Sequence, residues 1–146
     1  METTPPAARP AEPGLPTVGF DTGFFVRLLQ ADARAAGVWA DVRAGRVAGA
    51  VSCLTLFELD RLGLRGQIAR GPTEALVDAL PATCRVVWLG AGDGPDGGAA
   101  RLAHGNGLAM ADAVILASLL DAGAAAVYTT YPDLERYEGP VDIVVL

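Results

Sequence analysis

Short apolar runs alternate with helical patterns from Thr17 to the C-terminus of this chain. Such alternation is typical of βαβ units, in which consecutive strands run parallel and helices cover both faces of one sheet. It predicts a three-layer α/β/α domain with a central, mostly parallel sheet of five strands. The strands are expected at residues 17–20, 47–52, 84–89, 125–129 and 142–145.

The segments between these strands carry helical periodicity, apart from one loop and the N-terminus. A glycine-dense loop is expected from Gly90 to Gly98, and Asn106-Gly107 is a helix-ending pair. Residues 1–16 are crowded with Pro and Ala and lack an apolar period, which predicts a disordered arm before a single domain at 17–146. The helices are expected at 22–30, 31–44, 55–64, 72–80, 99–104 and 111–122, with one further turn at 134–137.

Composition narrows the possible functions. The net charge of −6 disfavours a protein that grips nucleic acid by bulk electrostatics, although bound divalent cations would offset it. Every one of the 11 basic side chains is Arg, so chemistry that needs Lys, such as a P-loop or a Schiff base, is excluded. No membrane span or secretory signal is predicted, and a cytoplasmic location is expected.

Four acidic residues lie where predicted strands end or the following helices begin. A parallel sheet gathers the carboxyl ends of its strands at one rim, where ligands bind in such folds. Mg²⁺ and Mn²⁺ prefer oxygen ligands, and a metal held by carboxylates can promote phosphodiester hydrolysis. The sequence therefore predicts one hard-metal site, kept ionised by nearby helix N-termini, formed by Asp21, Glu58, Asp112 and Asp133.

The same acids have a simpler interpretation as helix caps. Asp21 could cap the helix that begins at Thr22, and Asp112 or Asp133 could be first-turn acids matched to a helix dipole. Glu58 lies inside its helix, between apolar neighbours, and has no capping role. Four coincidental caps on one rim are the less favoured account.

Four sequence segments resemble, in order and spacing, the motifs of PIN domains. The resemblance covers nearly everything after residue 16. The segments are VGFDTGFF at 18–25, SCLTLFEL at 52–59, ADAVILASLL at 111–120 and VYTTYPDLERY at 127–137.

This resemblance implies a metal-dependent ribonuclease fold, best known as the toxin half of VapBC type II toxin–antitoxin pairs. It implies that the four acids hold Mg²⁺ or Mn²⁺, and that hydroxyl groups support them. It also implies an RNA substrate, a cognate antitoxin protein and a homodimer. The supporting hydroxyls correspond to Thr22 and Thr129 beside the acids, and to Ser52 and Thr55 in the turn that presents Glu58.

The last motif departs from the family pattern. That pattern reads Thr-x-Asp-x-Asp-Phe, and Tyr131 occupies its first Asp position here. A phenol is a poor Mg²⁺ ligand, so either Asp133 alone completes the site or the metal affinity is reduced. The alternative function is a catalytically lapsed module that binds RNA or a protein. A phosphatase with an Asp nucleophile is disfavoured, because it needs a second Asp where Gly23 stands and a Lys.

Arginines near the acids are candidates for RNA contact. Arg61 and Arg65 follow Glu58 by three and seven residues, so a helix would place them on the same face as Glu58. Arg27 is the next candidate. All three could bind phosphate groups, or could simply be solvated surface residues.

Overall fold

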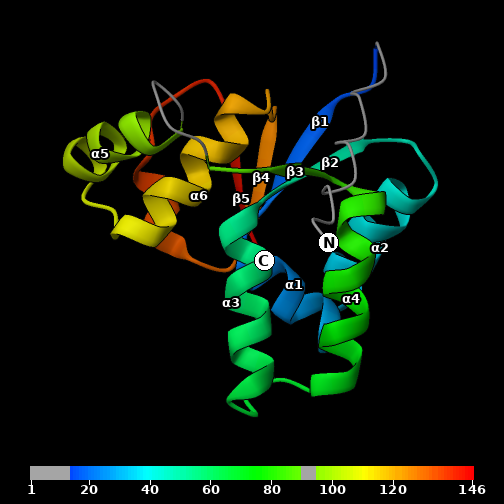
Figure 1. Cartoon of the computed structure of the whole chain (residues 1–146). Coiled ribbons are helices and arrows are strands. Elements are labelled where there is room, and N and C mark those ends of the chain that lie inside the picture. The colour runs from blue at the N-terminus through cyan, green and yellow to red at the C-terminus, as the bar shows by residue number, and fades with distance from the viewer. Residues whose placement is uncertain (1–13, 90–94) are drawn as a thin grey trace, which may run out of the picture.

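A computed structural model describes residues 14–89 and 95–146. Its centre is a sheet of five strands in the order β3-β2-β1-β4-β5, and every neighbouring pair is parallel (Figure 1). The expected fold class is therefore confirmed. The strands are β1 (Thr17–Phe20), β2 (Ala48–Ser52), β3 (Arg85–Val87), β4 (Ala126–Thr129) and β5 (Asp142–Val145).

Helices cover both faces of this sheet. α5 and α6 lie on one side, and α1, α2 and α4 on the other, while α3 and α4 form a hairpin that extends past the sheet (Figure 1). None of the helices in the described ranges is both long and apolar enough to cross a membrane. The helices are α1 (Thr22–Leu29), α2 (Ala33–Arg43), α3 (Cys53–Leu64), α4 (Arg70–Thr83), α5 (Pro95–Asn106), α6 (Met110–Asp121) and the 3-10 turn η1 (Pro132–Arg136).

One expected boundary, between the glycine-dense loop and the helix that follows it, is wrong. α5 begins at Pro95, so residues 95–98 are helical, whereas a loop was expected through Gly98. Proline is well suited to a first helical position, and it outweighs the two glycines that follow. Residues 90–94 of that expected loop, like residues 1–13 of the expected arm, lie outside the described residues. Pro16 belongs to the described part of this arm, and its carbonyl accepts a hydrogen bond from the Ala48 amide at 2.9 Å.

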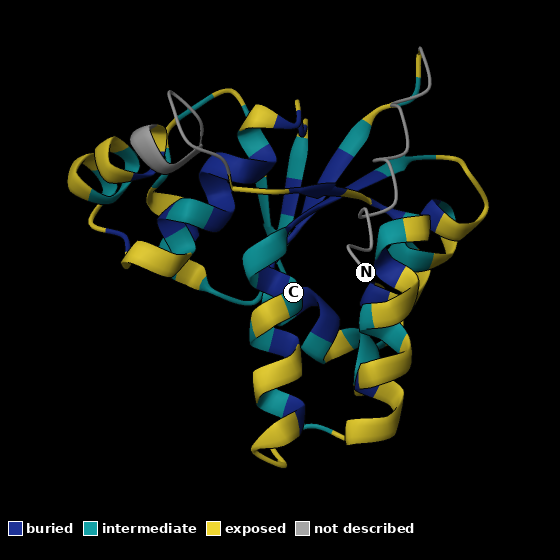
Figure 2. Cartoon of the chain, viewed as in Figure 1, coloured by how far each residue is buried: buried dark blue, intermediate teal, exposed yellow. Residues whose placement is uncertain are grey.

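Strand alternation sends side chains into two cores, one on each face of the sheet. Val18 and Phe20 of β1 face the cluster that includes Phe24, whereas Gly19 faces α6. A Cβ built on Gly19 would lie 2.9 Å from Leu119 Cδ1, so the missing side chain lets α6 pack directly on β1. Figure 2 shows buried and half-buried strands between these layers, with exposed residues at the tip of the α3–α4 hairpin.

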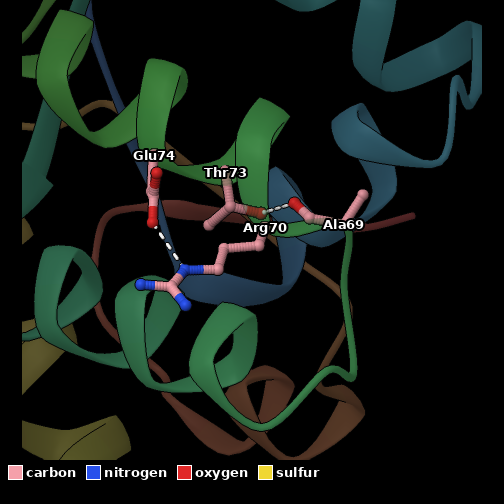
Figure 3. Close-up of polar contacts among 4 residues, drawn as sticks. All are labelled: Ala69, Arg70, Thr73 and Glu74. Atoms are coloured by element: carbon pink, nitrogen blue, oxygen red, sulfur yellow. Dashed lines mark hydrogen bonds and ion pairs between the residues drawn. The ribbon is translucent and has the colours of Figure 1, made fainter.

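The hairpin is closed by local contacts at the start of α4. The Thr73 hydroxyl donates to the Ala69 carbonyl at 2.7 Å, and Arg70 Nε pairs with Glu74 Oε1 at 2.7 Å (Figure 3). Thr73 is buried against Gly63 of α3, where a Cβ would lie 3.5 Å from Thr73 Cγ2. The packing of Thr73 against Gly63 places the start of α4 beside α3, the helix that carries Glu58.

Candidate acidic site

Asp21 lies at the end of β1 and caps α1. Its Oδ1 accepts a hydrogen bond from the Phe24 amide at 3.1 Å, and its Oδ2 accepts one from the Thr129 hydroxyl at the end of β4. The residue is only 7% exposed, and this burial raises its pKa to about 6 despite both hydrogen bonds. The capping interpretation is thus confirmed for Asp21, but capping uses one oxygen and leaves a buried carboxylate at the rim.

Glu58 presents an unsatisfied oxygen at the same rim. Its α3 helix begins directly after β2, and Ser52 caps it by accepting the Leu54 amide at 3.2 Å. Glu58 Oε1 is buried without a hydrogen-bond partner among the described residues. Burial raises the pKa of Glu58, and repulsion from Asp112 raises it further. A buried acceptor without a partner is costly, which points to a missing proton or cation.

Asp112 is the acid whose charge reaches the other three. It lies half-buried in the first turn of α6, where Ala109 provides no side-chain cap. Burial raises its pKa, followed by repulsion from Asp133. In turn its own charge raises the pKa of both Asp21 and Glu58. Asp112 therefore interacts electrostatically with acids from three other segments of the chain.

Burial and mutual repulsion shape this environment. Both raise the pKa of Asp21, Glu58 and Asp112, whereas hydrogen bonds from backbone amides at the start of α1 lower that of Asp21. Within the described ranges, no three acidic, His or Cys side chains are grouped closely enough to hold a metal ion.

Asp133 differs from the other acids because an arginine side chain forms an ion pair with it. It lies in η1, and Arg136 Nη2 is 3.1 Å from its Oδ1. Tyr131, which occupies the position of the missing acid, lies beside it, and a hydrogen bond to Asp133 raises the pKa of the phenol. The Tyr131 amide donates to the Thr129 hydroxyl oxygen at 2.9 Å, which ties this segment to the end of β4.

The expected hydroxyl groups divide into two kinds. The Thr129 hydroxyl donates a hydrogen bond to the Asp21 carboxylate, and the Thr22 hydroxyl lowers the pKa of Glu58 by hydrogen bonding. The Thr22 and buried Thr55 hydroxyl oxygens also lie within hydrogen-bonding distance, at 3.3 Å, which joins α1 to α3. Ser52 caps α3 and so supports the turn before Glu58.

The three candidate arginines are all exposed, and one of them lies near an acid. Arg61 is close enough to Glu58 for its charge to lower the pKa of that carboxyl. Arg27 and Arg65 lie at the C-terminal ends of α1 and α3. Arg61 is therefore the strongest of the three as a phosphate contact.

Sequence reasoning missed Gly23, whose role depends on a distant segment. A Cβ on Gly23 would lie 1.9 Å from Thr130 Oγ1 and 3.2 Å from the Thr130 amide nitrogen. The residue next to Thr130 is Thr129, which holds Asp21. The bare glycine therefore lets the end of β4 pack onto the start of α1, beside the acids. A glycine directly after an Asp-Thr pair was the available signal.

Gly23→Ala should destabilise the protein by about 1–3 kcal/mol, because the new methyl group overlaps Thr130. Gly37→Ala is the matched control, since Gly37 lies in α2 with open space around its Cβ direction, and it should be neutral or stabilising. Urea unfolding of both variants measures the difference. Equal stability of the two variants would contradict the close approach.

Comparison with known proteins gives the fold a name. No family model matches the sequence, and neither does any curated protein. Among solved structures, a chain of VapBC2 from Rickettsia felis, bound to a promoter DNA fragment, aligns with TM-score 0.68 and 13% identity over 89% of this chain and 98% of its own. A toxin–antitoxin complex from Klebsiella pneumoniae aligns with TM-score 0.62 and 18% identity over 86% and 99%.

A third similar structure is that of a nuclease. VapC20 from Mycobacterium tuberculosis, a sarcin–ricin loop cleaving toxin, aligns with TM-score 0.61 and 22% identity over 81% of this chain and 92% of its own. These identities are low, and what they establish is the three-dimensional fold. The chain has the VapC-like PIN-domain fold that its four sequence motifs implied.

Proposed function

We propose that this chain is a metal-dependent endoribonuclease that hydrolyses RNA phosphodiester bonds, and that it is the toxin of a toxin–antitoxin pair. The observation that carries the proposal is the unsatisfied Glu58 Oε1 beside Asp112, in a fold shared with a toxin that cleaves the sarcin–ricin loop. Helix capping accounts for Asp21 and leaves Glu58 unexplained. A site that binds a cation accounts for both.

The residues present suit Mg²⁺ or Mn²⁺ in their chemistry. Asp21, Glu58, Asp112 and Asp133 offer carboxylate oxygens, the donor type that these hard cations prefer. Three of the four have a raised pKa, which a bound cation would reverse. When bound, the metal would supply Lewis acidity for attack by water and for the charge on the leaving oxygen.

The remaining residues of the site would position the acids and the RNA. The Thr129 hydroxyl fixes Asp21, and Ser52 caps the helix that carries Glu58. Arg61 is exposed on the same helix, where its guanidinium can hold a phosphate of the RNA beside the acids. Arg27 and Arg65 would extend this contact along the backbone of the RNA.

A protein partner is part of the proposal. The similar structures include a toxin–antitoxin complex, and α3 exposes two large apolar side chains, Phe57 at 63% and Leu64 at 62%. They lie seven residues apart, and so on one side of the helix. We propose that this side of α3 contacts an antitoxin or a second copy of the chain. A short open reading frame beside the gene would supply the candidate antitoxin.

Cleavage of defined RNAs tests the proposed function. Purified protein should cut within at least one RNA of a panel that includes tRNA and a sarcin–ricin loop oligonucleotide, with Mn²⁺ and not with EDTA. An Asp112→Asn variant, purified identically, controls for contaminating nuclease. Intact RNA throughout, together with no Mn²⁺ binding by calorimetry, would instead favour the lapsed binding module that Tyr131 suggests.

A further inference from the structure

Arg136 links two segments that each carry an acid of the site. It ends η1, and its Nη2 lies 3.1 Å from Asp133 Oδ1. Its Nη1 donates a hydrogen bond at 3.2 Å to the carbonyl of Gly107, which is 29 residues away in the sequence. Gly107 has φ +65° and directly follows α5, at the start of the connection to α6, which carries Asp112 in its first turn.

The geometry suits an arginine and no other side chain. A guanidinium presents several N–H groups in a rigid fork, so it can hold a carboxylate and a carbonyl at once. The backbone that carries it is anchored by Leu134, which is 2% exposed and packs in the core beneath α6. The ion pair itself is exposed and contributes little to stability. The effect of the ion pair is therefore to fix the position of the Asp133 carboxylate.

We propose that Arg136 is a positioning residue for the divalent cation, which ties Asp133 to the α5–α6 turn and so fixes this carboxylate beside Asp112. The inference rests on the proposed function. Asp112 and Asp133 repel each other in the free protein, and the positive fork holds the segments that carry them together until a cation binds. Residues that hydrogen-bond to metal-ligating carboxylates commonly tune metal affinity by tenfold or more.

Calorimetry with Mn²⁺ alone tests this inference without RNA. Arg136→Lys keeps the charge but cannot reach both partners, and Arg136→Gln keeps donors but loses the charge. Positioning predicts that both variants bind Mn²⁺ about tenfold more weakly than wild type. If the Arg136 charge only competed with Mn²⁺ for the acids, Arg136→Gln would tighten Mn²⁺ binding and Arg136→Lys would leave it unchanged. That result would overturn the proposal. Arg43→Gln, an exposed arginine in the last turn of α2, is the control and should bind like wild type.

A double variant shows whether Arg136 acts through Asp133. In an Asp133→Asn background, Arg136→Gln should weaken Mn²⁺ binding little further, whereas additive losses would contradict the inference. Thermal unfolding of each variant checks that the fold is retained. Wild-type protein that binds no Mn²⁺ would refute the proposed function. Wild-type binding with unchanged Arg136 variants would refute only the positioning role.

Discussion

Asp112→Asn is expected to reduce RNA cleavage by about 100-fold or more, because it removes the carboxylate that interacts electrostatically with the other three acids. The charge of Asp112 raises the pKa of Asp21 and of Glu58, and Asp133 acts on Asp112 in turn. A cation held by these acids would therefore be bound most directly by this one. Partners outside the ligand set already cost tenfold to 100-fold when removed, so loss of a central ligand should cost at least as much.

The same substitution should leave the fold intact and stabilise the metal-free protein. Asparagine has nearly the shape of aspartate, and its neutral amide ends the repulsion of Asp21, Glu58 and Asp133. Urea unfolding in EDTA should therefore give a midpoint no lower than that of wild type. Asp121→Asn, at the exposed far end of the same helix, is the control and should retain full cleavage. An Asp112→Asn protein that cuts RNA like wild type would exclude the proposed metal site.

Sequence patterns predicted the features that depend on local chemistry. β1 and β5 have the expected bounds, because alternation and flanking breakers mark both strands clearly. The rim that gathers Asp21 and Asp112 follows from parallel connections, which place all strand carboxyl ends on one side. The start of α5 was misplaced, since the glycines after Pro95 are typical of a loop in isolation.

Features that depend on distant contacts could not be predicted in this way. The spacing of Asp133 and Arg136 could have suggested their ion pair, since residues three apart are neighbours on a helical turn. The second contact of Arg136, with the Gly107 carbonyl, has no sequence signal. The requirement for glycine at Gly23 likewise comes from a distant residue, Thr130, which lies directly after β4. The unsatisfied oxygen of Glu58 likewise depends on burial that only packing determines.

Stability of the metal-free protein should fall as the pH rises from about 4 to about 6, and Asp21 is the main cause. Its pKa is raised from 3.8 to about 6 in the folded state, so between these values the folded protein binds more protons than the unfolded chain. The free energy of unfolding then decreases with pH, by up to about 3 kcal/mol for a shift of this size. The raised pKa values of Glu58 and Asp112 act in the same direction.

Urea unfolding in EDTA from pH 4 to pH 7 measures this effect as the difference between wild type and Asp21→Asn. The asparagine can still accept the Phe24 amide, so the cap of α1 is kept while the titration is removed. Asp32→Asn, at the equivalent cap of α2, should keep the wild-type slope. A wild-type curve parallel to that of Asp21→Asn would show that the buried carboxylate is not titrating. Saturating Mn²⁺ in place of EDTA should raise the stability most at the upper end of this pH range, because the acids bind the cation only after they have lost their protons.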